Sequence, residues 1–121
     1  MTDDQHTKTA EDEAELEGWS LRRSALLRLP EHMRESARLY VEEGKVVEDG
    51  FIAAVARNDL RRSFQLADPA NTTHMGDWVA FFYYDVPSGA WGSREAVTTW
   101  ASVGGLRGLR AMHKRAAVAS A

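Results

Sequence analysis

Three residues in the middle of the chain, Asn58, Arg61 and Arg62, have side chains suited to holding a phosphate. Asparagine tolerates the left-handed backbone that ends a helix, and Asp59 could cap the helix that follows. Backbone N–H groups at a new helix start, together with two guanidinium groups, can bind an anion. The sequence therefore predicts an anion-binding turn here. The alternative is that the arginine pair lies on a solvated helix face.

A second candidate is the loop DVPSGAWGS, residues 85–93, which places Trp91 among small and polar residues. Ser88 and Ser93 offer hydroxyl groups, and Arg94 follows at the start of a predicted helix that could receive an anion. An indole in such a loop can stack on a base, which contributes roughly 1–3 kcal/mol. It can also seal the corner between two helices by burying about 200 Å² of its surface. We favour the sealing role, and the two roles are compatible if one ring face stays open.

His32 is the histidine whose position best suggests a role in ligand binding. It falls in the first turn of a helix that begins near Pro30, where the helix dipole disfavours a protonated imidazole. A neutral ring could offer an acceptor to a ligand, and the alternative is ordinary helix packing. No two of the four histidines have the i, i+4 spacing of a helical metal site, so we predict no metal.

The sequence contains no set of residues that converges on a reaction. Glu31 and Glu35 lie one helical turn apart, but nothing argues for the burial that would raise a carboxyl pKa for acid–base catalysis. The serines lack the setting of a hydrolase nucleophile, and the stretch GGLRGLR lacks the lysine of a Walker phosphate loop. We expect no catalytic residue, no cofactor and no enzymatic activity.

Helices must position these candidates, because the hydrophobic pattern of the chain is helical. Start signals stand at Pro30, Asp59, Asp68 and Ser93, and Gly44 is placed to end the first of these helices. No stretch shows sustained strand alternation bounded by hairpin turns. The predicted fold is all-α, a compact bundle of about five short helices.

Apolar spacing predicts which side chains face the core. The inward faces that we expect are formed by Leu60 and Phe64 in one helix and by Met75, Trp78, Val79 and Phe82 in another. Aromatic residues at 81–84 then cover nearly the whole circumference of the second helix. A helix that is apolar all round must be buried on every side, so we expect a homo-oligomer. Phe81, Tyr84 or the arm 19–29 would form its interface.

The charges divide the chain into three parts. Residues 1–17 contain seven acidic residues and one lysine, whereas residues 106–121 contain four basic residues and no acidic one. We predict a disordered acidic tail over 1–17, a single helical domain over 18–105, and a flexible basic tail over 106–121. A helix induced by a partner is the alternative for the basic tail. The nearly neutral body argues against a dedicated duplex-binding protein.

The whole chain has 121 residues, a net charge of −3 and no cysteine. One domain of this size can bury a core without disulfides or structural metals. The acidic N-terminus is no secretory signal, and no segment approaches the roughly 20 apolar residues of a membrane helix. We expect a cytoplasmic protein with no membrane partner.

An ordered series of motifs resembles a group of short proteins found in phage and prophage genomes. The motifs are LPEHMR (29–34), GFIAAVARNDL (50–60) and PSGAWGS (87–93), the last leading to Trp100. The group often has a cysteine where Ala90 stands, so no thiol function can be carried over. The resemblance implies no established activity. It implies a context, an accessory protein made in an infected or lysogenic bacterial cell, and such proteins often act against host defence.

Together these observations favour a non-enzymatic phage protein that binds and sequesters a small anionic ligand, such as a nucleotide immune signal. The second hypothesis is a protein-interaction module that inhibits a host defence protein, because the chain combines an aromatic-rich helix with two oppositely charged tails. A nucleic-acid-binding regulator that uses the basic tail ranks lower, since that tail is only weakly charged.

Overall fold

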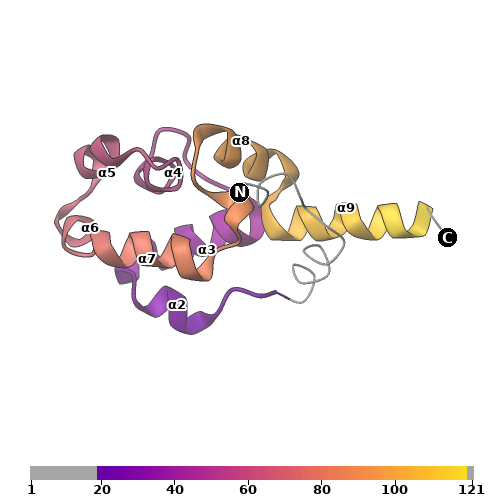
Figure 1. Cartoon of the computed structure of the whole chain (residues 1–121). Helices are drawn as coiled ribbons and strands as arrows, with labels where there is room; N and C mark the ends of the chain where they lie inside the picture. Colours follow the sequence, from indigo (N-terminus) through magenta and orange to yellow (C-terminus); the bar gives the residue numbers. More distant parts are fainter. Residues whose placement is uncertain (1–18, 120–121) are drawn as a thin grey trace, which may run out of the picture.

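A computed structural model describes residues 19–119 as an assembly of helices, with no strand in this part of the chain (Figure 1). Short 3-10 turns stand at η2 (Glu31–Met33) and η3 (Ser88–Ala90). The α-helices are α2 (Arg23–Leu27), α3 (Arg34–Glu43), α4 (Phe51–Ala56), α5 (Leu60–Leu66), α6 (Pro69–Thr73), α7 (Met75–Asp85), α8 (Arg94–Val103) and α9 (Gly105–Ala119). The predicted all-α fold is confirmed. The helices are more numerous than expected because the arm, the segment after Pro69 and the basic tail each supply one. The predicted acidic tail lies outside the described residues.

Side-chain caps begin three of the helices at the predicted residues. Asp59 accepts a hydrogen bond from the backbone N–H of Arg62, and Asp68 accepts one from that of Asn71. The Ser93 hydroxyl accepts one from the backbone N–H of Ala96. Such caps satisfy N–H groups that have no partner within the helix.

Two glycines allow the end of α3 and the start of α9 to touch. Gly44 has φ +69° and Gly105 has φ +66°, both in the left-handed region. A Cβ atom added to Gly105 would lie 2.4 Å from the backbone nitrogen of Gly44, and one added to Gly44 would lie 2.6 Å from that of Gly105. The two backbones therefore meet at a distance that only glycine permits.

The core is built around the indole of Trp78 in α7. Its ring is fully buried and lies 5.2 Å from the ring of Phe51, centroid to centroid, in an edge-to-face arrangement. Its Nε1–H donates to Asn71 Oδ1 at 2.9 Å. A second buried indole, Trp100, donates to the Tyr40 carbonyl, also at 2.9 Å. Both polar indole groups are satisfied, so these large rings can be buried without an unpaired donor.

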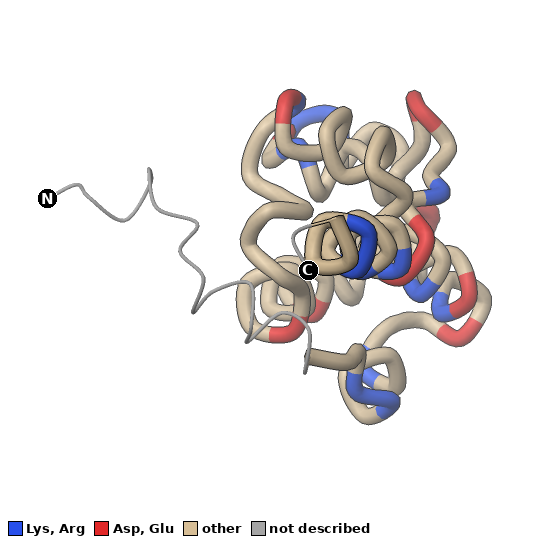
Figure 2. The backbone as a smooth tube through the Cα atoms, turned by 90° about the vertical axis from the view of Figure 1, so that its right-hand side faces the viewer, with Lys and Arg blue, Asp and Glu red and all other residues tan. Residues whose placement is uncertain are grey.

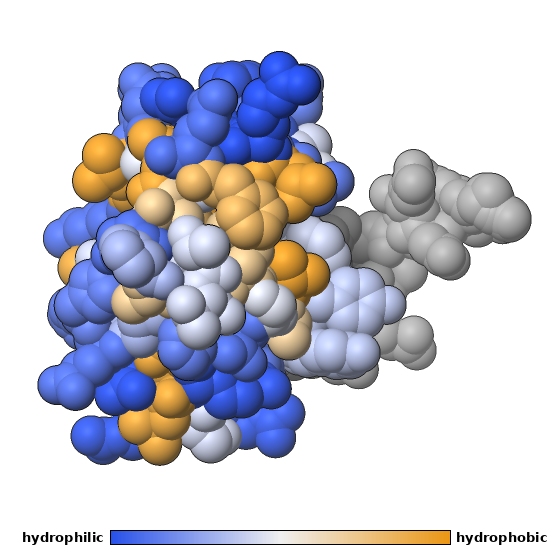
Figure 3. Space-filling model, turned by 90° about the vertical axis from the view of Figure 1, so that its left-hand side faces the viewer, coloured by the Kyte–Doolittle hydropathy of each residue, from blue (hydrophilic) through white to orange (hydrophobic). Residues whose placement is uncertain are grey.

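Some predicted core positions are wrong. Val79 is 55% exposed, whereas Phe81, two residues further on, is fully buried and cannot form the interface expected of it. Only one side of α7 packs against the core. Because aromatic residues occur on every side of this helix, the sequence pattern did not identify that side. Leu60 and Phe64 are also exposed, because α5 turns the small Ser63 inward instead. Figure 3 shows apolar side chains gathered among hydrophilic ones on the face of the molecule that carries α5 and α6.

The arm and the C-terminal segment both contact the body. The arm includes α2; its Arg28 forms an ion pair with Asp85 of α7, and its Leu29 is buried. The segment predicted to be a flexible basic tail forms helix α9, which packs against α3, buries Leu106 and then projects from the body (Figure 1). The side chain of Arg110 donates to the carbonyl of Trp19, which joins the arm to α9.

Candidate functional site

The fold brings the two phosphate-binding candidates of the sequence next to each other. The backbone N–H of Gly92 donates to the carbonyl of Ala56 at 2.7 Å, and this bond joins the tryptophan loop to the end of α4. Asn58 follows with φ +65°, the predicted left-handed turn. We refer to Arg57, Asn58, Trp91 and Ser93, which flank this bond, as the Trp91 surface.

Arg57 supplies a cation that the sequence analysis did not single out. Its Nε is buried and has no acceptor among residues 19–119. Its charge lies close to Tyr40, whose hydroxyl donates to the carbonyl of Ala90 at 2.5 Å. Burial raises the pKa of Tyr40 far above its usual range, and the positive charge of Arg57 acts in the opposite direction. The Arg57 guanidinium therefore lies near the loop backbone just before Trp91.

Trp91 is only partly buried and packs against the edge of the core. Its ring centroid lies 5.9 Å from that of the exposed Tyr83, with the two rings tilted by 59°. Its Nε1 is buried, and the described residues offer it no acceptor. The side chain packs against the core on one side and keeps part of its surface in solvent, so the sealing and stacking roles remain compatible.

The other predicted site residues that are close to Asn58 and Trp91 in the sequence are exposed, apart from the half-buried Ser93. Ser93 uses its hydroxyl to cap α8, and Arg94 is the exposed first residue of that helix. Ser88 is exposed at the start of η3. Arg61 and Arg62 are exposed on α5, where the Arg62 side chain donates to Gln65 at 3.4 Å.

His32 lies away from this group. Its Nε2–H donates to the carboxylate of Asp68 at 2.7 Å, linking η2 to the N-terminal cap of α6. Tyr40, which touches the tryptophan loop, lies in α3, eight residues beyond His32. The structure gives His32 a tethering contact, and it brings the histidine next to none of the other candidates.

This tether predicts a pH-dependent contribution from Asp68. The backbone N–H of Asn71 and, next, His32 lower the pKa of the Asp68 carboxyl. A lowered pKa stabilises the fold above the ordinary aspartate pKa of about 3.9, and the benefit is lost as the pH falls. Asp68→Ala should therefore lower the urea midpoint at pH 6 and change it much less at pH 2. Asp49→Ala, an exposed control, should have little effect at either pH, and an equal loss for Asp68→Ala at both would contradict this account.

The acidic residues on α3 are engaged in ion pairs. Arg38 lies 2.6 Å from a carboxylate oxygen of Glu35 and 2.7 Å from one of Glu42. The hydrogen bonds from Arg38 lower the pKa of Glu35. A general acid at neutral pH needs the opposite shift, so this pair is suited to holding the helix surface together.

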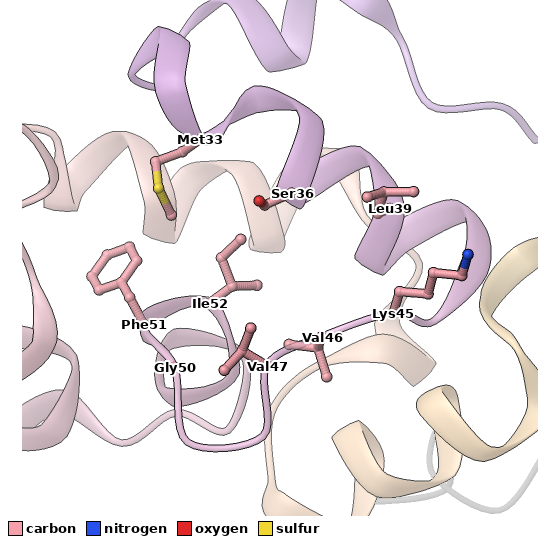
Figure 4. A pocket seen from close by; sticks show the side chains of 9 residues that line it. All are labelled: Met33, Ser36, Leu39, Lys45, Val46, Val47, Gly50, Phe51 and Ile52. Carbon is pink, nitrogen blue, oxygen red and sulfur yellow. The ribbon is translucent and has the colours of Figure 1, made fainter.

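A cavity of about 460 Å³ lies between α3 and the segment 45–52 (Figure 4). Met33 and Phe51 stand at one end of it and Lys45 at the other. The remaining lining residues are Ser36, Leu39, Val46, Val47, Gly50 and Ile52. The amine of Lys45 lies 3.3 Å from Glu43, which offsets its charge. The cavity is therefore mainly apolar, and it contains none of the site residues predicted from the sequence.

Two features are absent from the described part of the chain, residues 19–119. No group of three or more His, Asp or Glu side chains there is placed to hold a metal ion. None of its helices is long and apolar enough to cross a membrane. Comparison with known proteins found no family model, no curated protein and no solved structure that matches the chain.

Proposed function

We propose that the chain binds a small anionic ligand of the nucleotide class at the Trp91 surface and withholds it without chemical change. One observation carries the proposal. Arg57 Nε and Trp91 Nε1 are two buried donors without an acceptor in residues 19–119, and their residues flank one backbone hydrogen bond. An unpaired buried donor costs about 1–3 kcal/mol, so a ligand acceptor at this place would be favourable.

The chemistry of the surface fits the two ends of a nucleotide. A phosphate would pair with the Arg57 guanidinium in the bidentate manner that arginine favours, and Arg61 could reach its outer oxygens from the rim. A base would stack on the exposed part of Trp91 beside Tyr83. These contacts bind and orient a ligand, and none of them supplies a nucleophile or a general base.

The biological part of the proposal rests on the resemblance to short phage and prophage proteins. A protein that holds a nucleotide immune signal would lower the free concentration of that signal in the host cytoplasm. A homo-oligomer would multiply the number of sites per particle. Tyr84, which is 73% exposed on α7, and the arm are the surfaces left for such an interface once Phe81 is assigned to the core.

Thermal shift with a panel of cyclic and linear nucleotides tests this function. A ligand at a hundredfold excess over its Kd should stabilise the protein by about 2.7 kcal/mol, seen as a rise in Tm. Arg57→Gln should abolish that rise, because the guanidinium carries the phosphate contact. Arg23→Gln changes an exposed arginine of α2 and should leave the rise intact. A panel that moves no melting curve, or an equal rise in both variants, would overturn the proposal.

A second candidate function is binding to a host protein. The observation that favours it is the exposed pair Tyr83 and Tyr84, whose rings meet edge to face at 4.8 Å. Aromatic side chains that remain in solvent are common anchors of protein interfaces. A specific complex recovered from host lysate, together with an unresponsive nucleotide panel, would favour this function over the first.

A further inference from the structure

The outer half of α9, from Met112 on, has mostly exposed side chains. Its first turn is anchored, since Leu106 is buried against the body. Further along, Met112 is 43% exposed and Val118 is 76% exposed. Figure 1 shows the helix extending well beyond the other elements. An isolated helix of this length is marginal in water, so a second contact would stabilise it.

The charges of α9 are all of one sign. Its 15 residues include four basic side chains and no acidic one, as the blue positions along the helix in Figure 2 show. Arg107 lies 3.6 Å from Glu43 of α3, and Arg110 donates to Trp19. Lys114 and Arg115, further out, have no ion pair or hydrogen bond from their side chains within residues 19–119.

We propose that residues 9–17 of the same chain bind along the outer half of α9. This segment, TAEDEAELE, contains five acidic side chains and no basic one. It also ends two positions before Trp19, whose carbonyl is held by Arg110. Lys114 stands one helical turn beyond Arg110, about 6 Å along the axis. Because the acidic segment ends close to Trp19 in the sequence, a few of its residues would suffice to reach Lys114 and Arg115.

Attachment within one chain favours this occupant over a second molecule. A segment tethered by a short linker is present at an effective concentration in the millimolar range. The same surface on a second copy carries the same positive charges, so two α9 helices would repel each other. The contact goes beyond the proposed ligand site, because α9 contributes no residue to the Trp91 surface.

The contact has a consequence for other partners of α9. While the acidic segment lies on the helix, Lys114 and Arg115 are unavailable to nucleic acid or to another anionic surface. Salt weakens such pairing of exposed charges, since the Debye length falls from about 10 Å at 0.1 M to about 3 Å at 1 M. At low salt, the acidic segment would therefore compete with such anionic partners for the basic side chains of α9.

Zero-length carbodiimide cross-linking of the full chain tests the contact, because it joins a carboxylate directly to a neighbouring amine. Lys114 is the only lysine of α9. We expect a Lys114 cross-link to an acidic residue of 9–17 at low salt, and we expect it to be lost at 1 M salt. Lys45, 3.3 Å from Glu43, supplies an internal positive control.

Cross-linking a mixture of ¹⁴N- and ¹⁵N-labelled protein separates contacts within a chain from those between chains. Cross-linked peptide pairs in which both peptides carry the same isotope, without mixed pairs, support the proposal. Mixed products alone, or a Lys45 cross-link without any from Lys114 to 9–17, would overturn it. Hydrogen exchange gives an independent reading. The amides of 112–118 should exchange several-fold faster when the five acidic residues of 9–17 are replaced by Gln or Asn, and an unchanged rate would contradict the contact.

Discussion

Gly105→Ala is expected to destabilise the fold by at least about 2 kcal/mol, seen as a lower urea midpoint. The residue has φ +66°, where an alanine is strained, and the added Cβ would lie 2.4 Å from Gly44 N and 2.8 Å from the backbone of Glu43. These are backbone atoms, which cannot move aside as a flexible side chain can. The end of α3 and the start of α9 would have to separate.

The matched control is Gly76→Ala in α7. A Cβ at Gly76 would meet no atom within 4 Å, and alanine is a better helix former than glycine. This change should stabilise the protein by roughly 0.5–1 kcal/mol. If Gly105→Ala unfolds at the same urea concentration as the unchanged chain, the close approach of α3 and α9 is not part of the native fold.

The second large effect is expected for Trp78→Ala, which should cost about 3–5 kcal/mol. The indole is fully buried among Phe51, Phe81 and Phe82, so its removal leaves a cavity in the centre of the core. It also leaves the Asn71 side chain, itself buried, without its hydrogen-bond donor. Equilibrium unfolding by urea, followed by circular dichroism, measures the loss.

Val79→Ala is the control for the same helix. Val79 follows Trp78 directly but is 55% exposed, so its truncation should change the free energy of unfolding by less than about 0.5 kcal/mol. Similar losses for the two variants would mean that α7 packs through a different side. The comparison therefore tests the orientation of α7 as well as the contribution of the Trp78 side chain to the free energy of unfolding.

The helix boundaries were largely predictable because local chemistry determines them. Asp59, Asp68 and Ser93 cap helices through their own neighbours, and Gly44 ends α3 with the left-handed backbone that only glycine adopts easily. Such signals lie within a few residues of the feature that they specify. They need no knowledge of the rest of the fold.

The orientation of α7 and the full content of the site were less predictable, because distant segments decide them. Spacing favoured Val79 for the core and left Phe81 for an interface, and the packing of α7 beside α2, α4 and α6 reverses the two. Arg57 was missed for a similar reason. In the sequence it is a basic residue at a helix end, with no local signal of a binding role. Its position beside the Trp91 loop depends on the hydrogen bond between Gly92 and Ala56, which are distant in the sequence.

The contact between Trp19 and Arg110 joins positions 91 residues apart, and this sets the order in which the molecule can be completed during translation. The arm leaves the ribosome long before α9 exists, so it has to wait for its partner while the intervening helices are made. Closing so long a loop costs little more free energy than closing one of half its length, because the entropic cost of loop closure increases only with the logarithm of the loop length. A nascent chain that stops short of Gly105 has neither the Gly44 contact nor the Trp19 contact. Residues 105–110, at the start of α9, therefore make both of these contacts.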